Sequence, residues 1–288
     1  MSQTTYDAHF WAAAWQQSRQ QSSLGTGYAN LQGWEDFWNA IAGHMAQRNH
    51  QSQRLYQRII AILAQEGTIR RDDTILDIGC GPGTYTLPLA AFATKVTALD
   101  TATVMLDILQ EEARRENLDD RVEILTADWQ DIPETAAYDV AFAAKTPAIF
   151  DYGSLMKMNR VARRSCCLIG FSGPYRIRMR SLLWEYLFGA PLRSNAFDVT
   201  FPLNILCRSG FHPTLRYYRY REVYQETQEY MTRHYTQYFK IFGLSGKATE
   251  KKIADFLLSH MTDGHCPETI DAVLGVLTWQ VDGNPQVL

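Results

Sequence analysis

The sequence lacks long apolar runs, and its cysteines are few. No stretch approaches the ~18 consecutive apolar residues of a membrane span, so we expect none. Residues 1–20 are polar with a few aromatics and lack a charged region followed by an apolar core, which argues against a signal peptide. The five cysteines include no CxxC pair. An odd number without such a pair argues against a disulfide scaffold and predicts a reduced, cytoplasmic protein.

Positive charge is not in excess either. Lysine and arginine number 28 against 31 acidic residues, which gives a formal net charge of -3. Proteins that bind nucleic acid usually carry a basic face, so we expect no nucleic-acid partner. The hydrophobic fraction of 46% is typical of a globular protein. A chain of 288 residues can form one large α/β domain with appended helices, or two small domains.

The hydrophobic pattern changes near residue 67. Residues 1–66 contain no strand-like run, and their aromatic and aliphatic residues recur at helical spacing. We expect three helices there, over residues 8–19, 34–41 and 56–63, which together form an N-terminal helical cap or lid. From residue 67 to residue 288, short apolar strands alternate with helices of about ten residues, the pattern of βαβ units in a parallel sheet.

This second region predicts a Rossmann-like α/β domain with seven strands. The expected strands span residues 74–78, 95–99, 121–125, 139–143, 165–171, 214–222 and 272–281. The last two strands are separated by residues 223–269, which is long for an ordinary connection. Their pattern predicts a helical insertion before the last strand.

A glycine-rich corner follows the first of these strands. Residues 75–84 read ILDIGCGPGT, with Gly79, Gly81 and Gly83 at alternate positions around Cys80. Glycines permit a tight turn and let a ligand approach where a Cβ would collide. The helix that follows offers free N–H groups and the positive end of its dipole. We therefore expect this corner to bind an anionic group of a ligand.

Two common nucleotide-binding motifs are absent from this corner. The phosphate-binding P-loop needs GxxxxGK[ST], which the corner does not match. The dinucleotide fingerprint needs GxGxxG, and Thr84 stands at the position of its third glycine. An NAD-type oxidoreductase is therefore a disfavoured alternative.

What remains is GxGxG with Asp77 two positions before the first glycine. In this the sequence resembles the class I S-adenosylmethionine-dependent methyltransferases, and among them the group related to ubiquinone and menaquinone biosynthesis. The resemblance continues in order through VTALD at 96–100, Met105 and Leu106, ILTADW at 124–129 and YDVAF at 138–142. It covers about residues 70–221 and the last strand, which in this family is antiparallel to its neighbours.

The resemblance implies a cofactor site for S-adenosylmethionine, with S-adenosylhomocysteine as product. In the family, the counterpart of Asp77 lies near the methionine amino group, and that of Asp100 binds both ribose hydroxyls. A carboxylate suits a vicinal diol because it only accepts hydrogen bonds. The counterpart of Asp128 binds the adenine amino group, and Trp129 is expected to pack on the ring. The full predicted set is Asp77, Gly79, Cys80, Gly81, Gly83, Asp100, Thr101, Met105, Asp128 and Trp129.

The predicted reaction is methyl transfer to a small-molecule acceptor by in-line displacement. Alignment and exclusion of water supply much of the acceleration in such a reaction, so the sequence does not dictate a general base. Tyr85, Lys145 and Thr146 are candidate contacts to the acceptor. A non-catalytic S-adenosylmethionine sensor is the main alternative, and an RNA or protein methyltransferase is a weaker one. The acceptor and the oligomeric state stay open.

Two further clusters stand out. Residues 176–180 contain three alternate arginines, which could bind a carboxylate or phosphate, although such runs are more often solvated. His260, Asp263, His265 and Cys266 are residue types that ligate metals, but their spacing matches no zinc pattern. We therefore expect no metal site.

Overall fold

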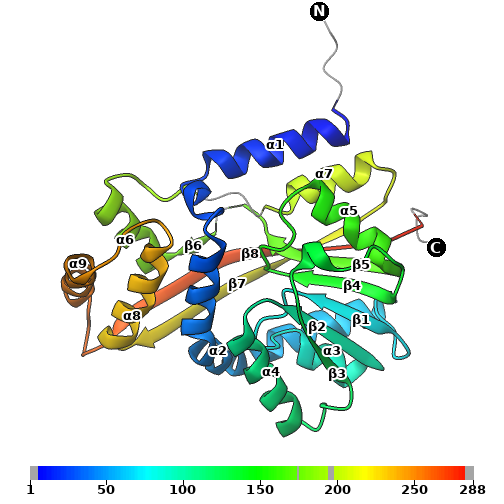
Figure 1. Cartoon of the computed structure of the whole chain (residues 1–288), viewed down its shortest axis with the longest axis horizontal. Coiled ribbons are helices and arrows are strands. Elements are labelled where there is room, and N and C mark those ends of the chain that lie inside the picture. Colours follow the sequence, from blue (N-terminus) through cyan, green and yellow to red (C-terminus); the bar gives the residue numbers. More distant parts are fainter. Residues whose placement is uncertain (1–5, 174, 194–197, 283–288) are drawn as a thin grey trace, which may run out of the picture.

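One mixed sheet forms the centre of the computed structural model, which describes residues 6–173, 175–193 and 198–282 (Figure 1). In the described residues the sheet has eight strands in the order β3-β2-β1-β4-β5-β8-β6, and β7 pairs with β8. The strands are β1 (Thr74–Ile78), β2 (Lys95–Asp100), β3 (Val122–Thr126), β4 (Tyr138–Ala144), β5 (Ala162–Phe171), β6 (Arg176–Ile177), β7 (Thr214–Glu226) and β8 (Cys266–Gln280).

Helices cover the sheet and its edges. They are α1 (Ala8–Gln21), η1 (Gly25–Gly27), α2 (Leu31–Gln65), α3 (Thr86–Phe92), α4 (Thr103–Arg115), η2 (Trp129–Asp131), α5 (Tyr152–Val161), α6 (Arg178–Phe188), α7 (Thr200–Arg208), α8 (Gln228–Lys240) and α9 (Lys247–Leu258). None of the described helices is long and apolar enough to cross a membrane.

Strands β1 to β5 pair in parallel, and β8 runs antiparallel to β5, β6 and β7. Ile75, Leu76 and Ile78 of β1 are completely buried, as expected of a strand covered on both faces. The predicted Rossmann-like α/β fold with an antiparallel last strand is thereby confirmed. The carboxyl ends of β1, β2 and β4 meet at one edge, where open α/β sheets bind ligands.

The N-terminal region differs from the prediction in one respect. The second and third predicted helices are a single helix, α2, of 35 residues. The polar residues between Ile41 and Tyr56 interrupt the hydrophobic pattern but include no proline, so the helix continues through them. Packing at both ends stabilises such a helix more than its local sequence does.

The two halves of α2 pack in different places. In the C-terminal half, Ile59, Ile60 and Leu63 are at most 3% exposed and lie in the core against β1 and α3. Full burial of each such side chain contributes about 1.5–3 kcal/mol. In the N-terminal half, Phe37 and Ile41 belong to a second cluster with residues of α4 and α8. The helix thus runs from the body of the sheet to its ligand-binding edge.

Strands β7 and β8 form a longer ribbon than predicted. Pairing continues as far as Glu226 opposite Cys266, so residues 223–226 and 266–269 are strand and not helical insertion. The helical part is confined to α8 and α9 and their loops. The ribbon projects beyond the rest of the sheet, and α6, α8 and α9 gather around its far end (Figure 1). The sequence pattern missed this end because every cross-strand pair there contains a polar residue, so neither strand has an apolar run.

Candidate functional site

The glycine corner lies at the carboxyl end of β1, held against β2. The amides of Gly79 and Cys80 donate to Leu99 O at 2.8 and 3.0 Å. Gly79, Gly81 and Gly83 have φ angles of 66°, 55° and 89°, which L side chains rarely adopt. A Cβ on Gly79 would lie 2.0 Å from Thr146 Oγ1, so the backbone here approaches its neighbour too closely for any side chain.

Asp77 lies directly beneath this corner. It is 2% exposed, and Thr86 Oγ1 donates to its Oδ2 at 2.6 Å. Burial raises the pKa of Asp77 to about 7, which the Thr86 hydrogen bond opposes and the charge of Asp100 supports. A buried carboxyl group with so high a pKa is suited to gain a cationic partner, because an opposite charge would favour ionisation.

Asp100 ends β2 and accepts two backbone hydrogen bonds. Gly81 N donates to Oδ2 at 2.8 Å, and Ala102 N donates to Oδ1 at 2.9 Å. Each carboxylate oxygen can accept more than one donor, so both retain capacity for the hydroxyls of a ribose. Of the other residues predicted here, Thr101 is exposed and Met105 is buried in α4.

Asp128 and Trp129 follow β3 and point in different directions. Asp128 is exposed and caps η2, accepting from Gln130 N at 2.7 Å. Trp129 is 3% exposed, and its Nε1 donates to Ser154 O of α5 at 3.3 Å. Lys157 Nζ lies 4.8 Å from the centre of the indole ring. The indole is therefore enclosed by α5, in contrast to the predicted packing on adenine.

Cys80 lies within the glycine corner and is 6% exposed. Burial raises the pKa of its thiol well above the usual value, and the nearby carboxylates of Asp77 and Asp100 add to this effect. The thiol is thus neutral at physiological pH, which suits a small packing residue rather than a nucleophile.

The three predicted acceptor-side residues gather beside the corner. Thr146 lies against Gly79, and Lys145 precedes it in the loop after β4. Tyr85, which follows the corner, is 3% exposed, and its hydroxyl has no hydrogen-bond partner among the described residues. The Lys145 ammonium lies 5.0 Å from the ring centre of Tyr56 and 5.8 Å from that of Tyr220. The ring of Tyr85 is 6.0 Å away.

Tyr56, Tyr220 and Glu222 were not among the predicted site residues. Tyr56 comes from α2, and the other two come from β7. Glu222 accepts hydrogen bonds from the hydroxyls of Tyr220 and Tyr224. Burial raises the pKa of Glu222. The hydrogen bond from Tyr220 and the charges of Lys145 and Arg48 oppose that rise. Alternation along β7 places its even-numbered residues on one face, and this was the signal available in the sequence.

A polar seam joins α2 to the same face of β7. Glu226 Oε1 lies 2.9 Å from His44 Nε2 and accepts from Arg48 Nε at 3.1 Å. The Arg48 guanidinium also lies 3.9 Å from the ring centre of Tyr224. Helix α2 thus covers the strand end where the predicted cofactor and acceptor residues meet.

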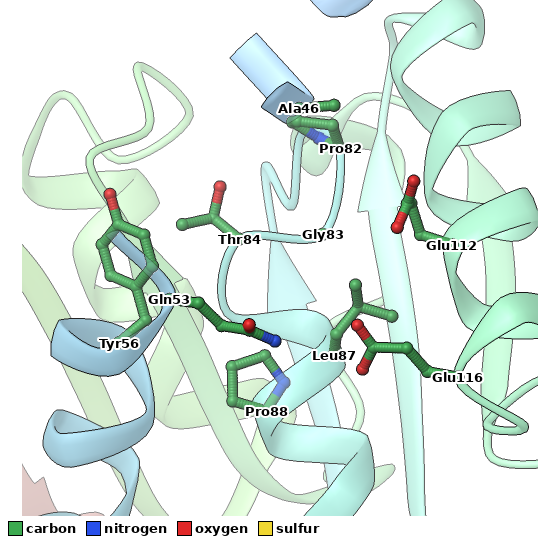
Figure 2. Close-up of a pocket in the computed structure, with 10 residues that line it drawn as sticks. All are labelled: Ala46, Gln53, Tyr56, Pro82, Gly83, Thr84, Leu87, Pro88, Glu112 and Glu116. Atoms are coloured by element: carbon green, nitrogen blue, oxygen red, sulfur yellow. The ribbon is translucent and has the colours of Figure 1, made fainter. Parts of the chain in front are cut away.

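A pocket of about 30 Å³ lies between α2 and the glycine corner (Figure 2). It is lined by Ala46, Gln53, Tyr56, Pro82, Gly83, Thr84, Leu87, Pro88, Glu112 and Glu116. This volume suits a water molecule, whereas ligand sites measure about 300–1,000 Å³. Asp77, Asp100 and Asp128 do not line it. The N-terminal half of α2 packs closely on α4 beside Asp100.

The second cluster noted in the sequence gathers no metal site. Among the described residues there is no group of three His, Cys, Asp or Glu side chains able to hold a metal ion. Cys266 is buried at the start of β8, and His265 pairs through its backbone with Thr262. His260 Nδ1 lies 2.8 Å from Phe256 O of its own helix.

Comparison with known proteins identifies the central part of the chain. Residues 75–166 match the family described as "Methyltransferase domain". An uncharacterized protein of Haemophilus influenzae is 29% identical over 164 residues, 54% of this chain and 57% of that protein. A protein of Methanosphaera stadtmanae, named a probable ribosomal RNA small subunit methyltransferase A, is 39% identical over 67 residues, 23% of this chain and 24% of its own. The chain thus spans about half or less of these relatives.

Among solved structures, the YcgJ protein of Bacillus subtilis superposes with a TM-score of 0.51 at 13% identity, over 80% of this chain and 98% of that one. At such identity the likeness concerns the fold alone. Residues 75–166 are therefore similar to methyltransferase domains, and the chain shares the Rossmann-like α/β fold of that solved structure.

Proposed function

We propose that this chain carries a class I methyltransferase domain and transfers the methyl group of S-adenosylmethionine to a small molecule. The observation that carries the proposal is one sheet edge that brings together a glycine corner and the acids that end β1, β2 and β3. A chance turn with nearby surface acids would not bury Asp77 beneath three glycines in left-handed conformations.

The residues at this edge match the chemistry of S-adenosylmethionine. The ionised form of Asp77 would hold the methionine ammonium. The Asp100 carboxylate would accept both ribose hydroxyls, and Asp128 would accept from the adenine amino group. When bound, the cofactor supplies a methyl group already activated by the positive sulfur. Cys80, Thr101, Met105 and Trp129 would contribute packing or backbone contacts.

The chain's own part in the reaction is alignment and exclusion of water. Thr146 and Lys145 follow β4 and border the glycine corner, so they would line the acceptor side. The rings of Tyr56, Tyr85 and Tyr220 lie within 6.0 Å of the Lys145 ammonium. Glu222, with its raised pKa, is the nearby group able to take a proton from an acceptor.

Two features favour a small acceptor over RNA or protein. The net charge of the chain is -3, and helix α2 covers the edge at which the acceptor must meet the methyl donor. An enclosed edge of this kind excludes a long polymer unless the helix moves. A relation to the ubiquinone and menaquinone group is part of the proposal and rests on the residues from 96 to 106. A cytoplasmic location is likewise proposed, from the reduced cysteines.

Calorimetry with Asp100→Ala tests the cofactor site. S-adenosylmethionine and S-adenosylhomocysteine should bind the wild type, and the variant should bind at least 10-fold more weakly, because a hydrogen bond to a charged group contributes about 1.5–3 kcal/mol. Asp107→Ala is the matched control, since this exposed acid lies on α4 close in sequence. NAD should not bind. Absence of binding by the wild type would remove the basis of the proposal.

Turnover separates an enzyme from a sensor. Radiolabelled S-adenosylmethionine is incubated with the protein and separated small-molecule, RNA and protein fractions of a cell extract. Label should enter the small-molecule fraction and disappear with Asp100→Ala. Label in the RNA or protein fraction would identify a different acceptor class, and tight binding without transfer to any fraction would favour a sensor.

A further inference from the structure

Two arginines near the acceptor side form no close ion pair, although the charge of Asp151 acts on Arg19 and that of Glu268 acts on Arg180. Arg19 in α1 and Arg180 in α6 each have an Nε that is shielded from water and without a hydrogen-bond partner in the described residues. Neither guanidinium forms an ion pair with a carboxylate in the part of the chain that the structure describes. Of the three alternate arginines at 176–180, Arg176 and Arg178 are exposed, and only Arg180 turns inward.

Elsewhere this protein pairs its partly buried arginines. Arg48 lies beside the buried carboxylate of Glu226, and Arg164 beside that of Asp73. Withdrawing a cation from water costs free energy unless an anion and hydrogen bonds compensate it. The unpaired state of Arg19 and Arg180 is therefore the exception within this molecule, and it calls for an anion from outside the chain.

The nearest buried acid does not fill that role. Glu268 Oε1 accepts from Met179 N at 3.0 Å and Thr269 N at 2.9 Å, and its Oε2 accepts from Tyr235 at 2.5 Å. Burial raises the pKa of Glu268, which these three hydrogen bonds oppose. Its oxygens are committed to groups other than a guanidinium.

Both arginines lie beyond the carboxyl ends of neighbouring strands. Arg19 Nη1 donates to Phe150 O at 2.7 Å, in the same loop after β4 that holds Lys145 and Thr146. The Arg180 guanidinium lies 5.2 Å from the ring centre of Tyr175, which stacks on Phe171 at the end of β5. The arginines thus belong to the acceptor edge of the sheet, and not to a distant surface.

Tyr28 contacts Arg19 and is close enough to Arg180 for the charge of Arg180 to act on it. The Arg19 guanidinium is 4.6 Å from its ring centre. Burial raises the pKa of the Tyr28 phenol, while a hydrogen bond from Ser22 and the charges of Arg19 and Arg180 lower it. The charges of both guanidinium groups therefore lower the pKa of the same tyrosine, although the two arginines are far apart in the sequence. On the far side, Arg180 lies 5.6 Å from the ring centre of Tyr238.

We infer that Arg19 and Arg180 form a subsite for an anionic group, a carboxylate or phosphate, on the acceptor. The inference rests on the proposed methyltransferase function and narrows its substrate class. Planar guanidinium groups bind such oxygens in a bidentate manner, and the surrounding tyrosine rings favour an aromatic or otherwise apolar body next to the charge. The methyl acceptor is therefore a small organic acid or phosphate ester.

Thermal unfolding with simple anions tests this subsite. The probes are benzoate, inorganic phosphate and the neutral benzamide, at constant ionic strength and with S-adenosylhomocysteine present or absent. Benzoate, phosphate or both should raise the unfolding midpoint saturably, and benzamide should not. Which anion acts separates a carboxylate from a phosphate ester.

Arginine variants decide whether these residues bind the anion. Arg19→Gln and Arg180→Gln should weaken the apparent anion affinity at least 10-fold. The exposed neighbour Arg178→Gln should leave it unchanged. If Arg180→Gln fails to fold, Arg180→Lys, which keeps the charge, replaces it in the measurement of anion affinity.

Some outcomes overturn the inference. It is wrong if no anion stabilises the wild type saturably, or if Arg178→Gln loses affinity as much as Arg180→Gln. Calorimetry with S-adenosylhomocysteine runs in parallel and reports only on the cofactor corner. If S-adenosylhomocysteine fails to bind while the anion still binds, the proposed function is wrong but the anion site stands. If S-adenosylhomocysteine binds and no anion does, the anion site is wrong and the proposed function stands.

Discussion

At the scale of single residues, Asp77 is a buried carboxyl group whose cost of burial the rest of the fold does not fully offset. Its hydrogen bond from Thr86 only partly offsets the cost of burial, so its pKa is raised to about 7. The unfolded chain would ionise near pH 3.9. Between these values the folded protein binds a proton that the unfolded chain has lost, and its stability therefore falls as the pH rises.

Asp77→Asn should remove this pH dependence. The variant and the wild type should have similar free energies of unfolding near pH 4. Above pH 7 the variant should be more stable by up to about 4 kcal/mol, at 1.36 kcal/mol per unit of pKa shift. Urea unfolding from pH 4 to pH 8 measures this, with the exposed Asp107→Asn as control. Parallel profiles for Asp77→Asn and the wild type would contradict the assigned role of burial.

The residues of the glycine corner could be located from the sequence, whereas the approach of Tyr56 and Tyr220 to Lys145 could not. Asp77, the three glycines and Asp100 follow their strands at fixed local spacing, so a short pattern locates them. Tyr56 and Tyr220 reach the same place from α2 and β7. Their meeting depends on how distant segments pack, and local periodicity carries no information about that.

At the scale of elements, α2 joins two environments with different roles. Its C-terminal half is anchored in the core on β1 and α3. Its N-terminal half packs on Ala102 and Met105 of α4, next to Asp100. The sequence predicted two helices here because the polar middle breaks the apolar stripe. Continuity of the backbone means that movement at one end of α2 is constrained by the other.

Amide hydrogen exchange should distinguish the two halves of α2. Saturating S-adenosylhomocysteine should slow exchange over residues 31–45, because the ligand adds contacts where that half covers the edge. Exchange over residues 56–65 should change little, since the core already protects it. Mass spectrometry of the peptic peptides gives both rates in one experiment. Equal protection of the two halves, or of neither, would show that α2 does not respond to the cofactor.

At the scale of the whole molecule, the cofactor edge and the helices that cover it share one continuous sheet. The positions of the parallel strands could be predicted from local apolar runs, and the antiparallel last strand from the family resemblance. The length of the β7–β8 ribbon could not, because its outer part, residues 223–226 and 266–269, contains no continuous apolar run.

Ligand binding should therefore stabilise the entire chain. At a concentration 100 times its dissociation constant, S-adenosylhomocysteine should raise the free energy of unfolding by about 2.7 kcal/mol. Urea denaturation with and without the ligand measures the difference. Asp100→Ala, if it binds at least 10-fold more weakly, should lower the gain to about 1.4 kcal/mol or less at the same concentration, and NAD should have no effect. An undiminished gain in Asp100→Ala would place the binding site elsewhere.

The extended β7–β8 ribbon has a consequence for how this molecule can diversify. Side chains alternate between its two faces, so adding two residues to each strand would keep every existing side chain on its own side. The same change would carry α8 and α9 outward by about 7 Å. Adding one residue would instead exchange the inner and outer faces beyond it. Descendants of this chain can therefore lengthen the ribbon in paired steps while the glycine corner stays unchanged.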